Sequence, residues 1–151
     1  MSEETNAGGF FPEWFKALDK GLENLETEHC ACLFSECAKM CASNVVQYFY
    51  RDIFDACEGN LDKFFTKLNE IDNVEGKIIK PGKAYELILG KCECPIHTDA
   101  GITSNHLCAC SKESLSHVFK ELVPHRPFQI EQLSTILGGS SVCRHRITFE
   151  G

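Results

Sequence analysis

The chain has 151 residues, of which 43% are hydrophobic and eleven are phenylalanine, so it is large and apolar enough to bury a core without cross-links. This composition excludes disorder over most of the chain. The net charge of −7 argues against a nucleic-acid partner, because binding to phosphates requires a basic surface.

The first nine residues are small, polar and acidic, and we expect a disordered tail at 1–9 ahead of a single domain at 10–151. They lack the basic segment and apolar run of a signal peptide. No stretch approaches the roughly 18 apolar residues that a membrane span needs. We therefore expect a cytoplasmic protein with no membrane partner, whose ten cysteines stay reduced.

Apolar residues recur at helical spacing through the first half of the chain. They predict a helix over 12–27 and a second over 29–57, with a break near Asn44 because asparagine favours a helix N-cap. A short third helix is expected over 61–68, after a Gly-Asn pair that ends the second.

The pattern changes to strands after residue 73. Apolar runs over 77–80 and 84–89 flank a Pro-Gly pair, which predicts two strands joined by a type II turn. The segment 91–110 is expected to be an irregular loop, and Ser111 to cap a helix that ends near Leu122.

The last segment predicts a hairpin with arms over 128–137 and 142–149, and a shift of phase in the first arm indicates a bulge. In the second arm, alternation places four residues on one face: Cys143, His145, Ile147 and Phe149. Helices followed by antiparallel strands predict an α+β fold, in which N-terminal helices pack on a C-terminal antiparallel sheet with one further helix.

Two Cys-x-Cys units, Cys92/Cys94 and Cys108/Cys110, are the clearest chemical signal in the sequence. Four thiolates brought together supply a tetrahedral soft-metal site, so we expect these four residues to bind zinc. The helix that follows the second unit should favour ionised thiols, because a helix N-terminus carries partial positive charge. Two alternatives stay open, namely redox-active thiols and simple packing of cysteine as a small hydrophobic residue.

A second group of candidates is expected to line a pocket or to form another cluster. Cys30, Cys37 and Cys41 share one face of the predicted helix, where they could face the loop thiols. Packing is the simpler interpretation for them and for the cysteine of the last strand. The full set is Cys30, Cys32, Cys37, Cys41, Cys143 and His145.

Over about residues 75–150 the order of motifs resembles a known group of proteins. The motifs are Cys92-Glu93-Cys94-Pro95, Cys108-Ala109-Cys110-Ser111, Gly138-Gly139 and Cys143-Arg144-His145-Arg146-Ile147. They resemble small cysteine-rich bacterial and archaeal proteins of largely unassigned function. Relatives of that group are the 4-vinyl reductase-type small-molecule-binding domain, the methanogen regulator output domain and the L-2-amino-thiazoline-4-carboxylic acid hydrolase-like family.

The resemblance implies an α+β fold with a ligand cavity and cysteines that hold zinc. The two Cys-x-Cys units match the cysteine element of these families, and Cys143 matches their terminal cysteine. The chain departs from the pattern at His145, where these families usually have phenylalanine, and this puts a polar group on the inner face of the sheet.

These observations predict a zinc-binding sensor or binding module for a small-molecule ligand. A thiol-dependent hydrolase and a cysteine redox switch are the alternatives, although no catalytic set of residues stands out. An exposed apolar edge would favour a homodimer.

Overall fold

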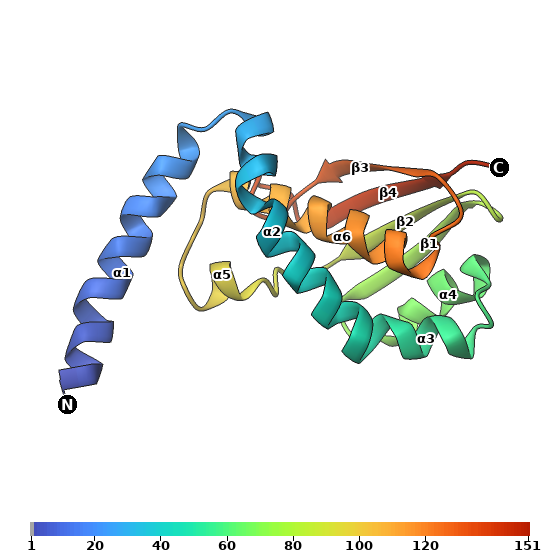
Figure 1. Ribbon diagram of the computed structural model, residues 1–151, viewed down its shortest axis with the longest axis horizontal. Coiled ribbons are helices and arrows are strands. Elements are labelled where there is room, and N and C mark those ends of the chain that lie inside the picture. Colours follow the sequence, from blue (N-terminus) through green and yellow to red (C-terminus); the bar gives the residue numbers. More distant parts are fainter. Residues whose placement is uncertain (1) are drawn as a thin grey trace.

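The computed structural model describes the backbone of residues 2–151 and the side chains from residue 9 onward. This part of the chain contains six α-helices and four strands, whose arrangement is drawn in Figure 1. The helices are α1 (Ser2–Glu23), α2 (Thr27–Val45), α3 (Arg51–Ala56), α4 (Leu61–Lys67), α5 (Pro95–Thr98) and α6 (Cys108–Leu122). The strands are β1 (Val74–Lys80), β2 (Ala84–Leu89), β3 (Phe128–Ser134) and β4 (Cys143–Phe149).

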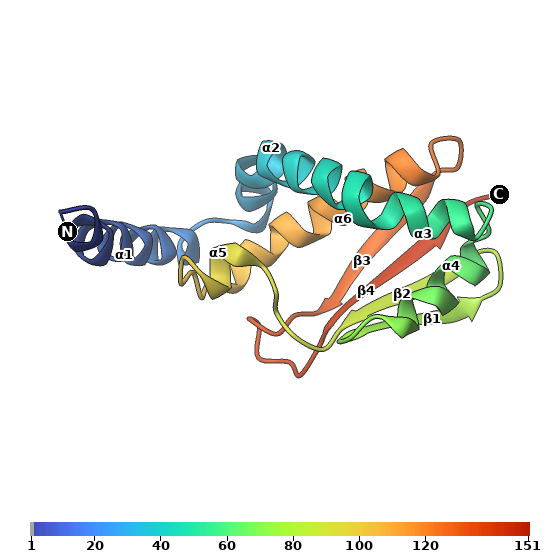
Figure 2. The ribbon, with the colours of Figure 1, turned by 90° about the horizontal axis from the view of Figure 1, so that it is seen from below.

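The four strands form one antiparallel sheet in the order β1-β2-β4-β3. Helices α4 and α6 contact the sheet, and α2 packs along α6 as a further layer on the same side. Figure 2 shows all these helices on one side of the sheet. The prediction of an α+β fold is therefore confirmed.

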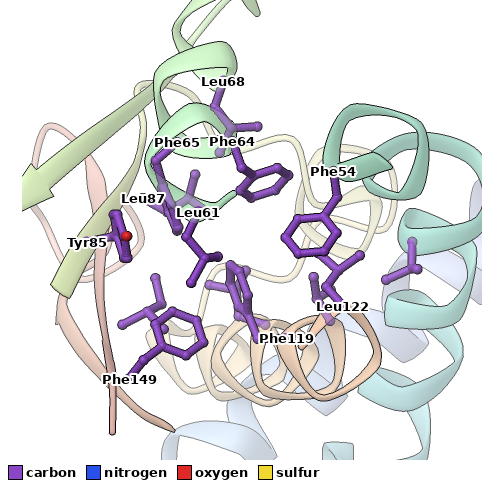
Figure 3. Close-up of a cluster of buried hydrophobic side chains, with 14 of the residues drawn as sticks. Phe54, Leu61, Phe64, Phe65, Leu68, Tyr85, Leu87, Phe119, Leu122 and Phe149 are labelled. Carbon is purple, nitrogen blue, oxygen red and sulfur yellow. The ribbon is translucent and has the colours of Figure 1, made fainter. Parts of the chain in front are cut away.

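Aromatic side chains fill the space between α4, α6 and the sheet (Figure 3). The ring of Phe65 lies between two others, stacked on Tyr85 at 4.4 Å and on Phe119 at 5.9 Å between centroids. Offset stacking of this kind adds roughly 0.5–1.5 kcal/mol per pair to the burial of the rings. These contacts fix the position of α6 on the sheet.

The other face of the central strands carries a charged cluster. The carboxylate of Glu86 in β2 accepts from Arg144 and from Arg146 of β4, with a shortest distance of 2.6 Å to each. Glu86 is only 3% exposed because the two arginine side chains cover it. The expected alternation along β4 is confirmed, since its arginines lie on the face opposite His145 and Ile147.

Helix α1 extends away from the body and is attached to it near its C-terminal end (Figures 1 and 2). Leu22 packs with Ile102 and Leu107 in a small apolar cluster. Next to it, the carboxylate of Asp19 accepts hydrogen bonds from the backbone N–H groups of Thr103 and Ser104. No helix in the described residues is both long and apolar enough to span a bilayer.

Three expected boundaries are wrong. The first helix begins at Ser2 rather than near residue 12. The expected disordered tail at 1–9 stays a prediction. Met1 lies outside the described residues. The single domain over 10–151 stays a prediction.

The second difference lies in the long helical segment, which continues through Asn44. The side-chain amide of Asn44 donates to the carbonyl of Met40 one turn earlier instead of capping a new helix. The irregularity comes afterwards, as a π turn at Val46–Tyr50 that leads directly into α3.

The third difference concerns the cysteine segment. It contains α5 and a 3₁₀ turn, η3 (Asn105–Leu107), and α6 begins at Cys108 rather than at Ser111. Ser104 caps the 3₁₀ turn, since its hydroxyl accepts from the N–H of His106. The helix therefore starts from an earlier cap than the sequence suggested.

Gly76 in β1 provides a test of this packing, because it lies directly against the backbone of α4. A Cβ atom at Gly76 would overlap the carbonyl group of Phe65, and the side chain of Asn69 bonds both the N–H and the C=O of Gly76. We expect G76A to lower the free energy of unfolding by about 2–4 kcal/mol. Urea denaturation measures this change.

The matched control is G21A in α1, where nothing lies within 4 Å of the added methyl group. It should be neutral or should stabilise the protein by up to about 1 kcal/mol through helix propensity. Equal effects of the two substitutions would contradict the close approach of β1 and α4.

Candidate functional site

A cavity of about 60 Å³ lies at the end of the sheet where β2 ends, β4 begins and α6 begins. Its apolar walls come from Leu89, Leu107 and Leu137. Its chemically distinctive residues are Cys92, Cys94, Cys108, Cys143, Gln132 and His145. Four cysteines from three separate segments of the chain therefore line one small space.

The first turn of α6 separates the two cysteines of the second Cys-x-Cys unit. Residues two apart in a helix lie about 200° apart around its axis and do not face each other. Cys108 is buried and lines the cavity, whereas Cys110 is not part of the lining. Of the four expected zinc ligands, the structure brings Cys92, Cys94 and Cys108 to the cavity, and Cys143 is the fourth cysteine there.

Cys110 instead lies toward α2. Burial, and then the neighbouring thiol groups of Cys41, Cys94 and Cys37, raise the pKa of Cys110 to about 12. The expected juxtaposition of helix thiols with the other Cys-x-Cys cysteines is thus partly present, with Cys37 and Cys41 near Cys110. Of the other two α2 cysteines, Cys30 is fully buried and Cys32 is exposed.

Two of the cavity thiols, Cys108 and Cys143, are stabilised in the protonated form. Burial is the main cause that raises the pKa of Cys108 to about 11, and Cys143, Cys92 and Cys94 add to the effect. Burial also raises the pKa of Cys143, although its sulfur accepts from the N–H of Ile136. Burial thus outweighs the helix N-terminus at Cys108, contrary to the expectation of an ionised thiol.

His145 lies in the wall of the cavity and is only 2% exposed. Its Nε2 lies 3.0 Å from Nε2 of Gln132, which also donates to the carbonyl oxygen of Cys108 at 2.8 Å. Burial, followed by the charge of Lys112, lowers the pKa of His145 to about 4, so the ring is neutral at physiological pH. Its Nδ1 is buried and has no hydrogen-bond partner among the described residues.

The side chains fit zinc in chemistry but not in arrangement. Thiols are good zinc ligands, and four of them line the cavity. However, in the part of the chain whose side chains are described, no group of three or more His, Cys, Asp or Glu residues is placed to hold a metal ion. Zinc binding therefore stays a prediction.

Sequence reasoning identified Cys143 and His145 but missed Gln132 and Thr135. Gln132 pairs with His145 across β3 and β4, so the two polar residues are neighbours on the inner face of the sheet. Thr135, which is buried, gives the Cys108 thiol a hydrogen bond that lowers its pKa slightly against the effect of burial. A polar residue opposite an inward histidine was the signal that could have found Gln132.

The substitution H145F tests the buried neutral histidine. Its pKa of about 4 lies below the unfolded value of 6.5, so the unfolded chain binds a proton first as the pH falls. The stabilisation is fully present above about pH 6.5 and is lost as the pH falls toward 4. H145F should remove about 2–3 kcal/mol of the loss in unfolding free energy between pH 7 and about 4.5.

Urea denaturation at a series of pH values measures this difference. The control is H125Q, because His125 is exposed, and it should leave the pH profile nearly unchanged. Parallel profiles for the wild type and H145F would show that protonation of His145 does not destabilise the protein.

Comparison with known proteins identifies no family for this chain. No protein-family model matches it, and no curated protein matches it significantly. Among solved structures, an H-NOX protein from S. oneidensis in the Fe(II)NO ligation state has 14% identity and a TM-score of 0.46, over 91% of this chain and 72% of the other. A trafficking protein particle complex subunit 3 from Naegleria fowleri, covalently bound to palmitic acid, has 9% identity and a TM-score of 0.45, over 93% of both chains.

Proposed function

We propose that this protein is a binding module whose small-molecule ligand occupies the thiol-lined cavity. The observation that carries the proposal is the convergence of Cys92, Cys94, Cys108 and Cys143 with His145 around one space of about 60 Å³. Small-molecule sites are typically concave and mostly apolar, with a few polar groups that orient the ligand. This cavity has that composition.

The size and charge of the cavity limit what it can hold. The volume of about 60 Å³ exceeds the roughly 10–15 Å³ that one water molecule needs, so the space suits a small molecule of a few heavy atoms. The charged residues of the lining are Lys91 and Glu93, which balance each other. The cavity therefore favours a small neutral molecule over a charged one.

The geometry supports binding better than thiol-dependent hydrolysis. A catalytic cysteine needs a thiolate, or a neighbouring base with a free lone pair. The pKa values of Cys108 and Cys143 are raised, so both are neutral thiols at pH 7. The ring nitrogen of His145 that bonds Gln132 is already engaged, which leaves no free base oriented by that contact.

Substitution C143L tests the proposal by filling the cavity with a larger side chain. Wild-type protein under xenon pressure should show methyl NMR shifts at Leu89, Leu107 and Leu137, because small apolar cavities take up xenon. C143L should abolish these shifts and change the unfolding free energy by less than about 2 kcal/mol.

The control is C32L, which makes the same chemical change at an exposed position of α2 and should leave xenon binding intact. Absence of xenon shifts in the wild type would argue that the cavity is closed to ligands.

Zinc is the second candidate occupant, and the four cavity thiols are the observation that favours it. The donor set would then be Cys92, Cys94, Cys108 and Cys143, with Cys143 in the place of Cys110. Bound zinc would supply a structural cross-link between the loop after β2, α6 and β4. The donors would have to move together for this, because no three of the described donors already meet.

Elemental analysis of anaerobically purified protein separates the two donor sets. If Cys143 is a ligand, C143S should lower the zinc content from about one ion per chain and C110S should not. The reverse result would favour the set expected from sequence, with Cys110 as the fourth ligand. No zinc in the wild type would remove this candidate.

A further inference from the structure

The buried ring of His145 lines the cavity, and one of its nitrogens is unsatisfied. Buried polar groups almost always have hydrogen-bond partners, so an exception at a cavity wall indicates that something is missing from the site. Nδ1 of His145 is such an exception among the described residues, and the whole side chain is 2% exposed. In a neutral imidazole one ring nitrogen donates a hydrogen bond and the other accepts one.

Gln132 settles the role of each ring nitrogen. Its Nε2 lies 2.8 Å from the carbonyl oxygen of Cys108, which can only accept, so this atom is the amide NH₂ group and not the amide oxygen. The second hydrogen of the same group is then available to Nε2 of His145 at 3.0 Å. Nε2 of His145 must therefore accept, and in a neutral imidazole the proton lies on Nδ1.

We propose that the cavity recognises a small neutral molecule through one hydrogen-bond acceptor, such as a carbonyl oxygen, which accepts from Nδ1–H of His145. This inference rests on the proposed binding function and specifies the chemistry of the ligand. The protonated Nδ1 cannot coordinate a metal ion, so His145 selects an acceptor and not a cation.

The rest of the cavity agrees with such a ligand. Its leucine side chains suit an apolar body, and the neutral thiols of Cys108 and Cys143 are weak hydrogen-bond donors that compete little for the acceptor. Lys91 and Glu93 provide no net charge that would favour an anion. His145 is then the residue that adds polar selectivity to an apolar pocket.

Two measurements test the inference. The first is long-range ¹H–¹⁵N correlation on histidine-labelled protein without any ligand, which reports the tautomer of each ring. We expect the Nδ1–H tautomer for His145, and we expect Q132L to abolish this preference because the donor to Nε2 is gone. An Nε2–H ring in the wild type would overturn the inference whatever the protein binds.

The second measurement is titration with two probes of the same shape and number of heavy atoms, cyclopentanone and methylenecyclopentane. Only the ketone has an acceptor. We expect cyclopentanone to shift the His145 Nδ1–H signal of the wild type, and we expect H145F to lower the affinity for cyclopentanone relative to that for methylenecyclopentane roughly tenfold.

The outcomes separate the two proposals. An unchanged ratio of the two affinities in H145F would overturn the inference about the acceptor and leave the binding function standing. Failure of both probes to shift any cavity resonance would overturn both proposals. Zinc that removes the Nδ1 proton of His145 would also overturn the inference, because the ring would then be a metal ligand.

Discussion

The stacking of Phe119 on Phe65 is the contact on which the candidate site depends, because it fixes how α6 is rotated about its axis. Eleven residues make three helical turns plus about 20°, so Phe119 and Cys108 lie on nearly the same side of α6. A helix that turns Phe119 into the aromatic core must also turn Cys108 toward the sheet. The same rotation turns Cys110 toward α2. The two cysteines of this Cys-x-Cys unit therefore lie in different surroundings, one at the cavity and one beside α2.

The fold class and most elements could be predicted from periodicity and turn residues. The Pro-Gly turn is an example, with Gly82 at a positive φ of 74° between β1 and β2. The helix boundaries were less predictable, because they depend on contacts distant in sequence or on local caps. The Asn44 side chain bonds within its helix, and Ser104 caps a turn that lets α6 start three residues before the expected cap.

The sequence predicted that cysteines form the site, but it did not predict which four cysteines. Counting cysteines located Cys92, Cys94 and Cys108 at one site, and strand alternation turned Cys143 and His145 inward. The identity of the fourth cysteine at the cavity depended on whether Cys108 and Cys110 are in a loop or in a helix. An extended pair can share one ion, whereas a helical pair cannot, and a boundary shift of three residues decides between them. Gln132 could be assigned to the site only once its pairing with His145 across β3 and β4 was known.

The rotation of α6 has a consequence for how sequences of this type can diverge. Substitutions within Ser111–Ser114 leave the rotation of α6 unchanged, but the loss or gain of one residue there would turn Cys108 by about 100° relative to Phe119. The aromatic core would hold its end of the helix, and the thiol end would leave the cavity. The length of this short stretch is therefore under stronger constraint than its composition, so related chains that keep the cavity should differ there by replacement and not by insertion.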